Sequence, residues 1–229
     1  MTAAIPFRSL LQRLAFGAGA LLLCGAALAS PQAEPPASAP AAAPVAAPVE
    51  AAPVAPVVKG PQVALKTSMG QIVLQLDEEK APKTVANFMQ YVKQGFYKGT
   101  IFHRVIEGFM IQAGGMNEKF EGRKTNKPVK NESNNGLSNQ PYTVSMARED
   151  HPDSATSQFF INVADNSGID HPFYKGSGYT VFGKVVKGQE VVDKIKGVMV
   201  DDVRGMQNVP VKPIFIQSVT VLKGDKLVK

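Results

Sequence analysis

Cysteine is almost missing from this chain. Its 229 residues contain one cysteine, three histidines and no tryptophan. The single cysteine, Cys24, excludes an intrachain disulfide framework and a cysteine-based zinc site. The histidines, His103, His151 and His171, lie far apart and show neither HExxH nor HxH spacing. The sequence therefore predicts no metal site.

The common catalytic and cofactor-binding motifs are also missing. Ser154 and Ser157 lie near His151, but no GxSxG turn surrounds either serine. Gly176-Ser177-Gly178 is a lone GxG, which is typical of a turn, and Gly183-Lys184 lacks the upstream glycine of a phosphate-binding loop. We therefore expect no bound cofactor.

Basic residues are scattered rather than clustered. The chain has 25 Lys and Arg against 19 Asp and Glu, which gives a formal net charge of +6. No group of lysines and arginines is interleaved with aromatic residues, so the sequence predicts no nucleic-acid surface. Scattered lysines that keep the surface soluble explain the charge better.

The first 29 residues have the pattern of a secretory signal peptide. Arg8 and Arg13 form a positive start, an apolar run follows from Leu14 to Leu28, and Ala27-Leu28-Ala29 supplies a small-residue cleavage site. We predict cleavage after Ala29, which changes the formal charge from +6 to 6 − 2 = +4. The arrangement is typical of bacteria and predicts a periplasmic protein with no stable membrane insertion.

Two alternatives for this segment stay open. An uncleaved membrane anchor is one, but the apolar run is shorter than the ~20 residues needed to span a bilayer. Lipid attachment at Cys24 is the other. Loss of Cys24 with the cleaved signal peptide is favoured over it, because Leu23 stands where a lipid-attachment site usually has a small residue.

Residues 30–58 form an Ala/Pro-rich linker. The stretch 31–58 holds 11 alanines, 8 prolines and no aromatic residue. Because proline lacks a backbone N–H, the segment favours extended polyproline II over helix or sheet. It could hold a domain up to about 90 Å from an attachment point. An unattached disordered tail and a proline-rich ligand for a partner are the alternatives.

Residues 59–229 form one globular domain. Apolar alternation around Ser68-Met69-Gly70 predicts a hairpin over 63–76. Pro82 near the start, Gly95 at the end and apolar residues at i, i+3, i+4 and i+7 predict a helix, and a shorter helix is predicted over 189–195. Short apolar runs predict further strands, and the polar stretch 114–141 predicts a long loop. The runs cover 101–106, 109–113, 142–147, 158–163, 180–186 and 213–222. Many short strands with two helices indicate an antiparallel barrel or sandwich.

One cation lies among these apolar runs. Strand alternation places Phe102, Arg104 and Ile106 on one face, and Met110 and Gln112 together after a turn. A buried, unpaired guanidinium is costly, so Arg104 either reaches the surface or lines a groove. Later, Gln158 and Phe160 share a face of another strand. Such a groove would accept a small apolar ring beside a peptide bond, and plain core packing with Arg104 at the rim is the alternative.

Three ordered motifs carry a family resemblance. The runs FHRVIEGFMIQAGG (102–115), SQFFI (157–161) and VFGKVV (181–186) resemble the cyclophilin family of peptidyl-prolyl cis-trans isomerases, and the exported bacterial members most of all. The likeness covers about residues 62–222. It implies a mainly β fold, a closed eight-stranded antiparallel β-barrel capped by two α-helices, with the active site in a groove on the outside of the barrel.

The resemblance also implies the roles of site residues. Arg104 matches the catalytic arginine, while Gln112, Gln158, Ala147 and Arg148 match residues that contact the substrate backbone. The walls of the proline pocket match Phe109, Met110 and Phe160, with Ile169 at the usual leucine position and Tyr179 where many eukaryotic members have histidine.

Two positions depart from the family pattern. Arg148 stands where the family often has asparagine, and Gly168 stands where other members carry tryptophan or phenylalanine. The missing apolar wall at Gly168 argues against tight cyclosporin binding.

The sequence thus predicts a monomeric periplasmic isomerase that acts on proline-containing polypeptides and assists the folding of exported proteins. Rotation about an X–Pro bond makes and breaks no covalent bond, which agrees with the missing nucleophile, metal and cofactor motifs. A proline-peptide-binding module or holdase with little turnover is the alternative from another class, and a purely structural barrel is the third. Exchange between the cis and trans forms of a bound peptide separates these hypotheses.

Overall fold

The computed structural model describes residues 60–222. The predicted signal peptide over 1–29, Cys24 and the predicted linker over 30–58 lie outside the described residues, so these assignments stay predictions. In the described part, no helix is both long and apolar enough to cross a membrane.

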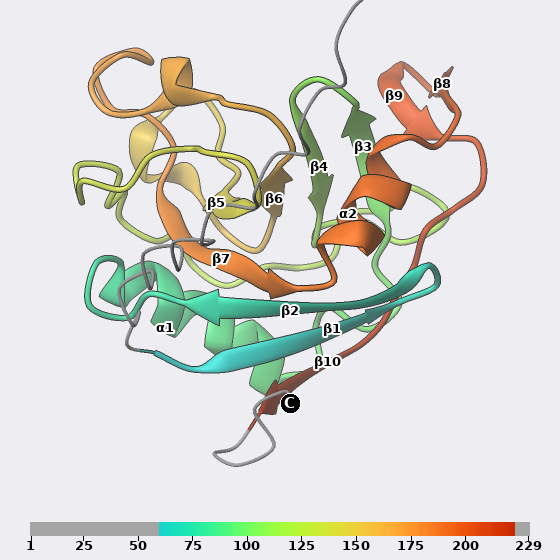
Figure 1. The fold of residues 1–229 in the computed structure, drawn as a ribbon, viewed down its shortest axis with the longest axis horizontal. Helices are drawn as coiled ribbons and strands as arrows, with labels where there is room; N and C mark the ends of the chain where they lie inside the picture. Colours follow the sequence, from blue (N-terminus) through green and yellow to red (C-terminus); the bar gives the residue numbers. More distant parts are fainter. Residues whose placement is uncertain (1–59, 223–229) are drawn as a thin grey trace, which may run out of the picture. The chain divides into compact units, whose positions relative to one another are not determined.

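The domain is built on one antiparallel sheet of eight strands. The strands follow the order β10-β1-β2-β7-β5-β6-β4-β3 (Figure 1). Their bounds are β1 Gln62–Thr67, β2 Gly70–Leu76, β3 Phe102–Ile106, β4 Met110–Ala113, β5 Thr143–Met146, β6 Phe159–Asn162, β7 Val181–Lys187 and β10 Ile216–Leu222. Every predicted apolar run coincides with one of these strands to within three residues at either end, so the prediction of a mainly β domain is confirmed.

The sheet is strongly curled but open. Its edge strands are β10 and β3, and between them the described residues form only an isolated antiparallel bridge, Ile101 to Phe215. The N–H of Phe102 donates to the carbonyl oxygen of Ile214 (2.9 Å) beside this bridge. A full ladder does not join the two edges, so the closed barrel stays a prediction.

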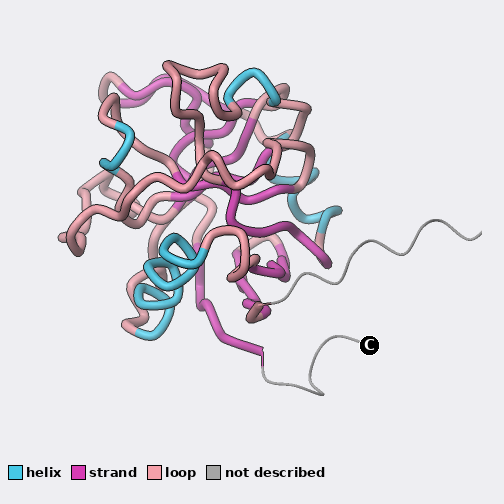
Figure 2. The backbone as a smooth tube through the Cα atoms, turned by 90° about the vertical axis from the view of Figure 1, so that its left-hand side faces the viewer, coloured by secondary structure: helices cyan, strands magenta, loops and turns pink. Residues whose placement is uncertain are grey.

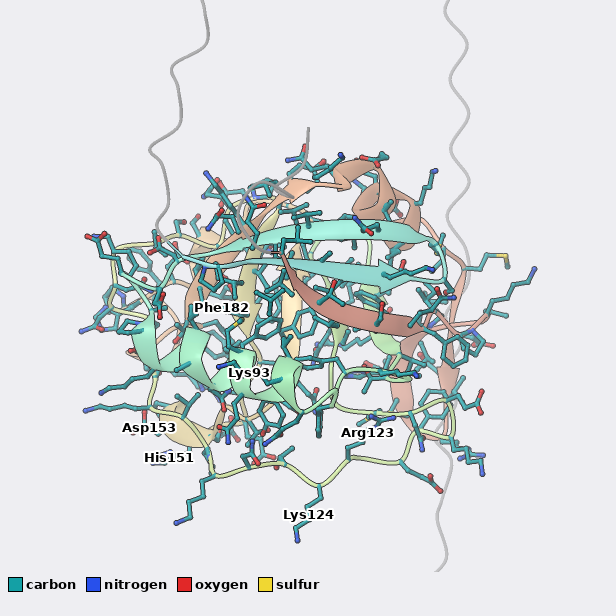
Figure 3. All side chains as sticks on the ribbon, turned by 90° about the horizontal axis from the view of Figure 1, so that it is seen from below. Lys93, Arg123, Lys124, His151, Asp153 and Phe182 are labelled. Atoms are coloured by element: carbon teal, nitrogen blue, oxygen red, sulfur yellow. The ribbon has the colours of Figure 1, made fainter. Side chains whose placement is uncertain are left out.

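The core lies between the curled sheet and the two helices. Strands β1 and β2 contribute fully buried apolar residues to this core, namely Val63, Leu65, Ile72 and Leu74. The ring of Phe88, from the first helix, packs at 5.1 to 5.5 Å between ring centroids against three other aromatic rings. These rings belong to Tyr97, Phe159 and Phe182, and Figure 3 shows Phe182 on the strand side of that helix.

Helix α1 spans Pro82–Lys93 and obtains its N-terminal cap from a distant residue. Ala81 at the cap position makes no side-chain hydrogen bond. Instead, the carboxylate of Glu132 accepts from the N–H of Lys83 (3.1 Å) and from the N–H and hydroxyl of Thr84 (2.9 and 2.7 Å). This carboxylate satisfies N–H groups that have no partner inside the helix. The long polar loop is thereby fixed to α1.

Helix α2 spans Gln189–Lys196 and follows a glycine that the backbone requires. Gly188 has φ +85°, and a Cβ atom there would lie 2.2 Å from the carbonyl oxygen of Gln71. Val191, Val192 and Ile195 are buried as predicted. The second predicted helix is therefore confirmed, one residue longer than expected.

Two features differ from the sequence-based expectation. A separate hairpin, β8 (Val200–Val203) and β9 (Met206–Pro210), stands beside β3 in Figure 1, and its polar sequence gave no strand signal. The expectation that Phe102 and Arg104 share a face was wrong. Phe102 is fully buried in the core whereas Arg104 is exposed, because the β3–β4 register shifts between them.

Loops cover much of the remaining surface. Figure 2 shows the side of the domain that carries most of these connections, drawn in pink. Two short 3-10 helices, Pro152–Ser154 and Ser167–Ile169, interrupt them. In Figure 3, Lys124 extends outward from the loop that passes beyond α1.

Candidate active site

The predicted site residues meet at one hollow on the outside of the sheet. This main hollow has a volume of about 190 Å³. It is lined by Arg104, Phe109, Met110, Gln112, Ala147, Arg148, Phe160, Ile169 and Tyr179. The tenth predicted residue, Gln158, lines an adjoining hollow. Residues from three strands and from three connections between strands thus come together as the sequence motifs implied, and their individual roles stay predictions.

Arg104 projects from the middle of β3 beside this hollow. The side chain is exposed, and within residues 60–222 its guanidinium has no hydrogen-bond or ion-pair partner. The shifted register of β3 turns it outward, away from the buried neighbours Phe102 and Val105. Its N–H donors are therefore available to a ligand at the hollow.

Several of the side chains that line the main hollow beside Arg104 are apolar. Met110 and Phe160 come from adjacent strands, β4 and β6, and their side chains are only 2% and 4% exposed. The ring of Phe160 meets that of Tyr179 edge-to-face at 5.6 Å. Phe109 sits at the β3–β4 turn, where its carbonyl oxygen accepts from the side chain of Asn166 (2.8 Å). These groups give the main hollow an apolar surface that a small apolar ring could contact.

Two glutamines connect the main hollow to its neighbour. Gln112 Nε2 donates to Gln158 Oε1 at 2.8 Å, which leaves the amide oxygen of Gln112 as an acceptor. Gly115 allows this arrangement, because a Cβ there would lie 2.5 Å from Cγ of Gln158. The second hollow, about 130 Å³, shares Gln112, Ala147 and Arg148 with the first.

The guanidinium of Arg148 is used as a clamp between two loops. It donates to the carbonyl oxygens of Gly178 (3.0 Å) and Glu149 (2.8 Å) and to the hydroxyl of Ser177 (3.1 Å). It also lies 4.8 Å from the ring centroid of Tyr179. Its side chain therefore holds the loop that carries Tyr179 against the loop after β5.

Tyr179 is held in a partly buried position at the rim. Burial, and then its hydrogen bond with Tyr174, raise the pKa of Tyr179 to about 12. The phenol of Tyr179 therefore stays neutral at physiological pH while its side chain lines the main hollow. This position has no titration near neutrality, unlike a histidine there.

A third hollow, about 340 Å³, lies on the other side of Arg104. It is lined by His103, Arg104, Gly205, Met206 and Gln207, so the unpredicted β8–β9 hairpin forms its far wall. The polar sequence of the hairpin carried no signal that could have placed it here. The main hollow shares Gln112, Ala147 and Arg148 with the second hollow and Arg104 with the third, so the three adjoin as one groove in which Arg104 lies between the main and the third hollow.

His103 lies next to Arg104 but behind the surface. Its side chain is 5% exposed, and burial lowers its pKa to about 4. The imidazole is therefore neutral at pH 7, and it adds no second positive charge beside the guanidinium.

Two further observations bear on what the groove can bind. A Cβ placed on Gly168 would have no heavy atom within 4 Å, so the rim is open where an aromatic wall was expected in the family. Among residues 60–222, no three His, Cys, Asp or Glu side chains are grouped to hold a metal ion.

The curled antiparallel sheet carries a groove flanked by an arginine, as the sequence motifs implied. The family model described as "Cyclophilin type peptidyl-prolyl cis-trans isomerase/CLD" matches residues 62–221. The chain belongs to this family of isomerases, as the sequence motifs indicated.

Curated relatives and a solved structure agree with this assignment. The chain is 58% identical over 161 residues to "Peptidyl-prolyl cis-trans isomerase A" of Dickeya dadantii (strain 3937), which covers 70% of this chain and 84% of that protein. It is 50% identical over 161 residues to "Peptidyl-prolyl cis-trans isomerase B" of Escherichia coli (strain K12), over 69% of this chain and 98% of that protein. A Cryptosporidium parvum cyclophilin-type isomerase, crystallised in the presence of the dipeptide Ala-Pro, superposes with a TM-score of 0.59 at 25% identity, over 71% of this chain and 99% of that one.

Proposed function

We propose that the groove accelerates cis–trans rotation of X–Pro bonds in proline-containing polypeptides, with Arg104 as the catalytic residue. The observation that carries this proposal is the position of Arg104. Its exposed guanidinium has no hydrogen-bond or ion-pair partner within residues 60–222 and flanks an apolar hollow walled by Met110 and Phe160.

The chemistry requires no cofactor. Rotation about a peptide C–N bond faces a barrier of about 18–20 kcal/mol, because conjugation must be lost. In the twisted transition state the proline nitrogen regains a lone pair, and a fixed guanidinium can donate a hydrogen bond to it. That interaction is absent from the planar ground state, so it lowers the barrier rather than strengthening ground-state binding. Arginine suits this role because it stays protonated and its fork of donors is planar and preorganised.

The remaining groups hold the two sides of the rotating bond apart. The apolar wall of Phe109, Met110 and Phe160 holds the proline ring. The amide oxygen of Gln112 and the main chain at Ala147 face the peptide group that precedes it. With both ends fixed, rotation is confined to one bond.

The decisive measurement is the isomerisation of a proline tetrapeptide. Arg104→Ala is expected to lower kcat/KM at least tenfold without changing the far-UV circular dichroism, and Arg104→Lys should restore only part of the activity because a lysine lacks the planar fork. Arg123→Ala, at an arginine that binds the carbonyl oxygen of Phe96, is the matched control. Full activity in Arg104→Ala would refute the proposed role. Peptide binding without cis–trans exchange in the wild type would instead favour a binding module.

We also propose that this isomerase works in the periplasm on exported proteins. The positive start, apolar run and Ala27-Leu28-Ala29 site of residues 1–29 support this location. Protein isolated from its native cells should appear in the periplasmic fraction and begin at Ser30. A cytosolic protein that retains Met1 would contradict the proposal.

A further inference from the structure

The sequence preceding the domain repeats one dipeptide. Five Ala–Pro bonds occur in residues 31–58, at 39–40, 43–44, 47–48, 52–53 and 55–56. The last four are each followed by valine. Residues 60–222 contain one further Ala–Pro bond, Ala81–Pro82, where α1 begins. The chain therefore carries, outside the described residues, a series of X–Pro bonds in which the residue before proline is the small alanine.

We propose that the Ala–Pro units of residues 39–49 bind in the main hollow of the same molecule and are isomerised there. The segment is then an internal substrate that competes with other polypeptides for the groove. The inference rests on the proposed function, because it assigns a particular ligand to the same site.

The main hollow matches this dipeptide in size and chemistry. Its volume of about 190 Å³ is below the roughly 300–1,000 Å³ of common small-molecule sites. It therefore suits a single five-membered ring with its peptide groups. Alanine before the proline adds only a methyl group, so it passes Gln112 and Ala147 without a side chain that needs its own pocket. The second and third hollows continue the groove on both sides, which accommodates an extended chain.

The length of the segment allows its outer units to reach the groove. Pro40 and Pro48 precede Gly60 by 20 and 12 residues, which corresponds to about 65 and 40 Å of extended chain. A domain of the size of residues 60–222 is about 40 Å across. The three units at 39–40, 43–44 and 47–48 can therefore reach around the domain. A tethered ligand of this kind has an effective concentration on the order of 1 mM, so even weak binding is populated.

Another apolar hollow competes for such a segment. It is about 430 Å³ in volume and is lined mainly by apolar side chains, among them Met69, Val198, Met199 and Ile214. Met199 is 81% exposed. No arginine or side-chain amide lines this hollow, so it could bury valine and proline rings but could not hold the carbonyl groups that flank an X–Pro bond. The main hollow is therefore the better match.

Exchange NMR on the protein carrying all of residues 31–58, with labelled proline, tests the inference. A free X–Pro bond exchanges in tens to hundreds of seconds. The Ala43–Pro44 bond in the protein is expected to exchange at least tenfold faster than in a synthetic peptide of residues 37–58. The acceleration should persist on dilution and disappear in Arg104→Ala.

Four outcomes would overturn the inference. An uncatalysed rate at Ala43–Pro44, in a protein that isomerises an added tetrapeptide, would remove the internal substrate and leave the proposed function intact. A protein that accelerates neither the Ala43–Pro44 bond nor the added tetrapeptide would refute the proposed function as well. A rate proportional to protein concentration would show binding between molecules. Unaccelerated exchange with signal changes at Met69 and Met199 would assign the segment to the larger apolar hollow.

Discussion

Burial of His103 makes the stability of the domain depend on pH. Its pKa is lowered from 6.5 to about 4 in the folded protein, mainly by burial. Between these values the unfolded chain binds a proton at this position and the folded protein does not. Stability therefore decreases as the pH falls from about 6.5 to about 4, and this contribution then levels off.

The structure sets the size of this effect. With pKa values of 6.5 and about 4, the linkage relation gives a loss of about 2 kcal/mol at pH 5 and about 3 kcal/mol below pH 4. His103 is only 5% exposed, so little of this is reduced by solvent. The expected loss at pH 5 is a large part of the 5–15 kcal/mol stability of a typical domain.

Urea unfolding at pH 7.5 and pH 5.0 measures the difference. In His103→Gln the side chain cannot titrate, so the free energy of unfolding should fall by about 2 kcal/mol less between these pH values than in the wild type. Changes in packing affect both pH values and cancel in this comparison. His171→Gln, at an exposed histidine, is the matched control. An equal decrease in wild type and His103→Gln would refute the reasoning.

Two further predictions concern the helix cap and the open rim. Glu132→Ala removes the acceptor of three hydrogen bonds at the start of α1. In urea unfolding it should lower the free energy of unfolding by about 1–2 kcal/mol. Glu118→Ala, at an exposed glutamate, is the control, and equal stability of the two variants would contradict the role of Glu132 as the helix cap. Gly168→Trp places an indole in open space at the rim and should tighten cyclosporin inhibition of peptide isomerisation at least tenfold. That factor corresponds to the ~1.5–3 kcal/mol gained by burying a large apolar side chain. Gly122→Trp, also in open space, is the control, and similar inhibition of both variants would count against the rim.

Local pattern was sufficient to predict most of the fold. The alternation over Val63–Leu76 and the apolar stripe of α1 depend on neighbours in sequence, and both elements occur where they were predicted. The residues of the groove could be named because they follow ordered motifs on adjacent strands. Their assembly around one hollow agrees with that ordering.

The remaining features depend on contacts that no local pattern contains. Glu132 reaches Thr84 across 48 residues, and Arg148 bonds to Gly178 across 30 residues. The register shift in β3 reverses the face of Phe102, which simple alternation cannot anticipate. The hairpin β8–β9 buries little apolar surface and so leaves no hydrophobic signal, although it forms one side of the groove.

The first and last strands of the domain are neighbours. Gln62 at the start of β1 pairs with Leu222 at the end of β10, so the two ends of the described chain lie next to each other. The backbone is therefore nearly a ring, and a short connection could join its ends while a new opening is cut in an exposed loop elsewhere. A rearranged gene of this kind would preserve every strand pairing and free the catalytic unit from whatever precedes it.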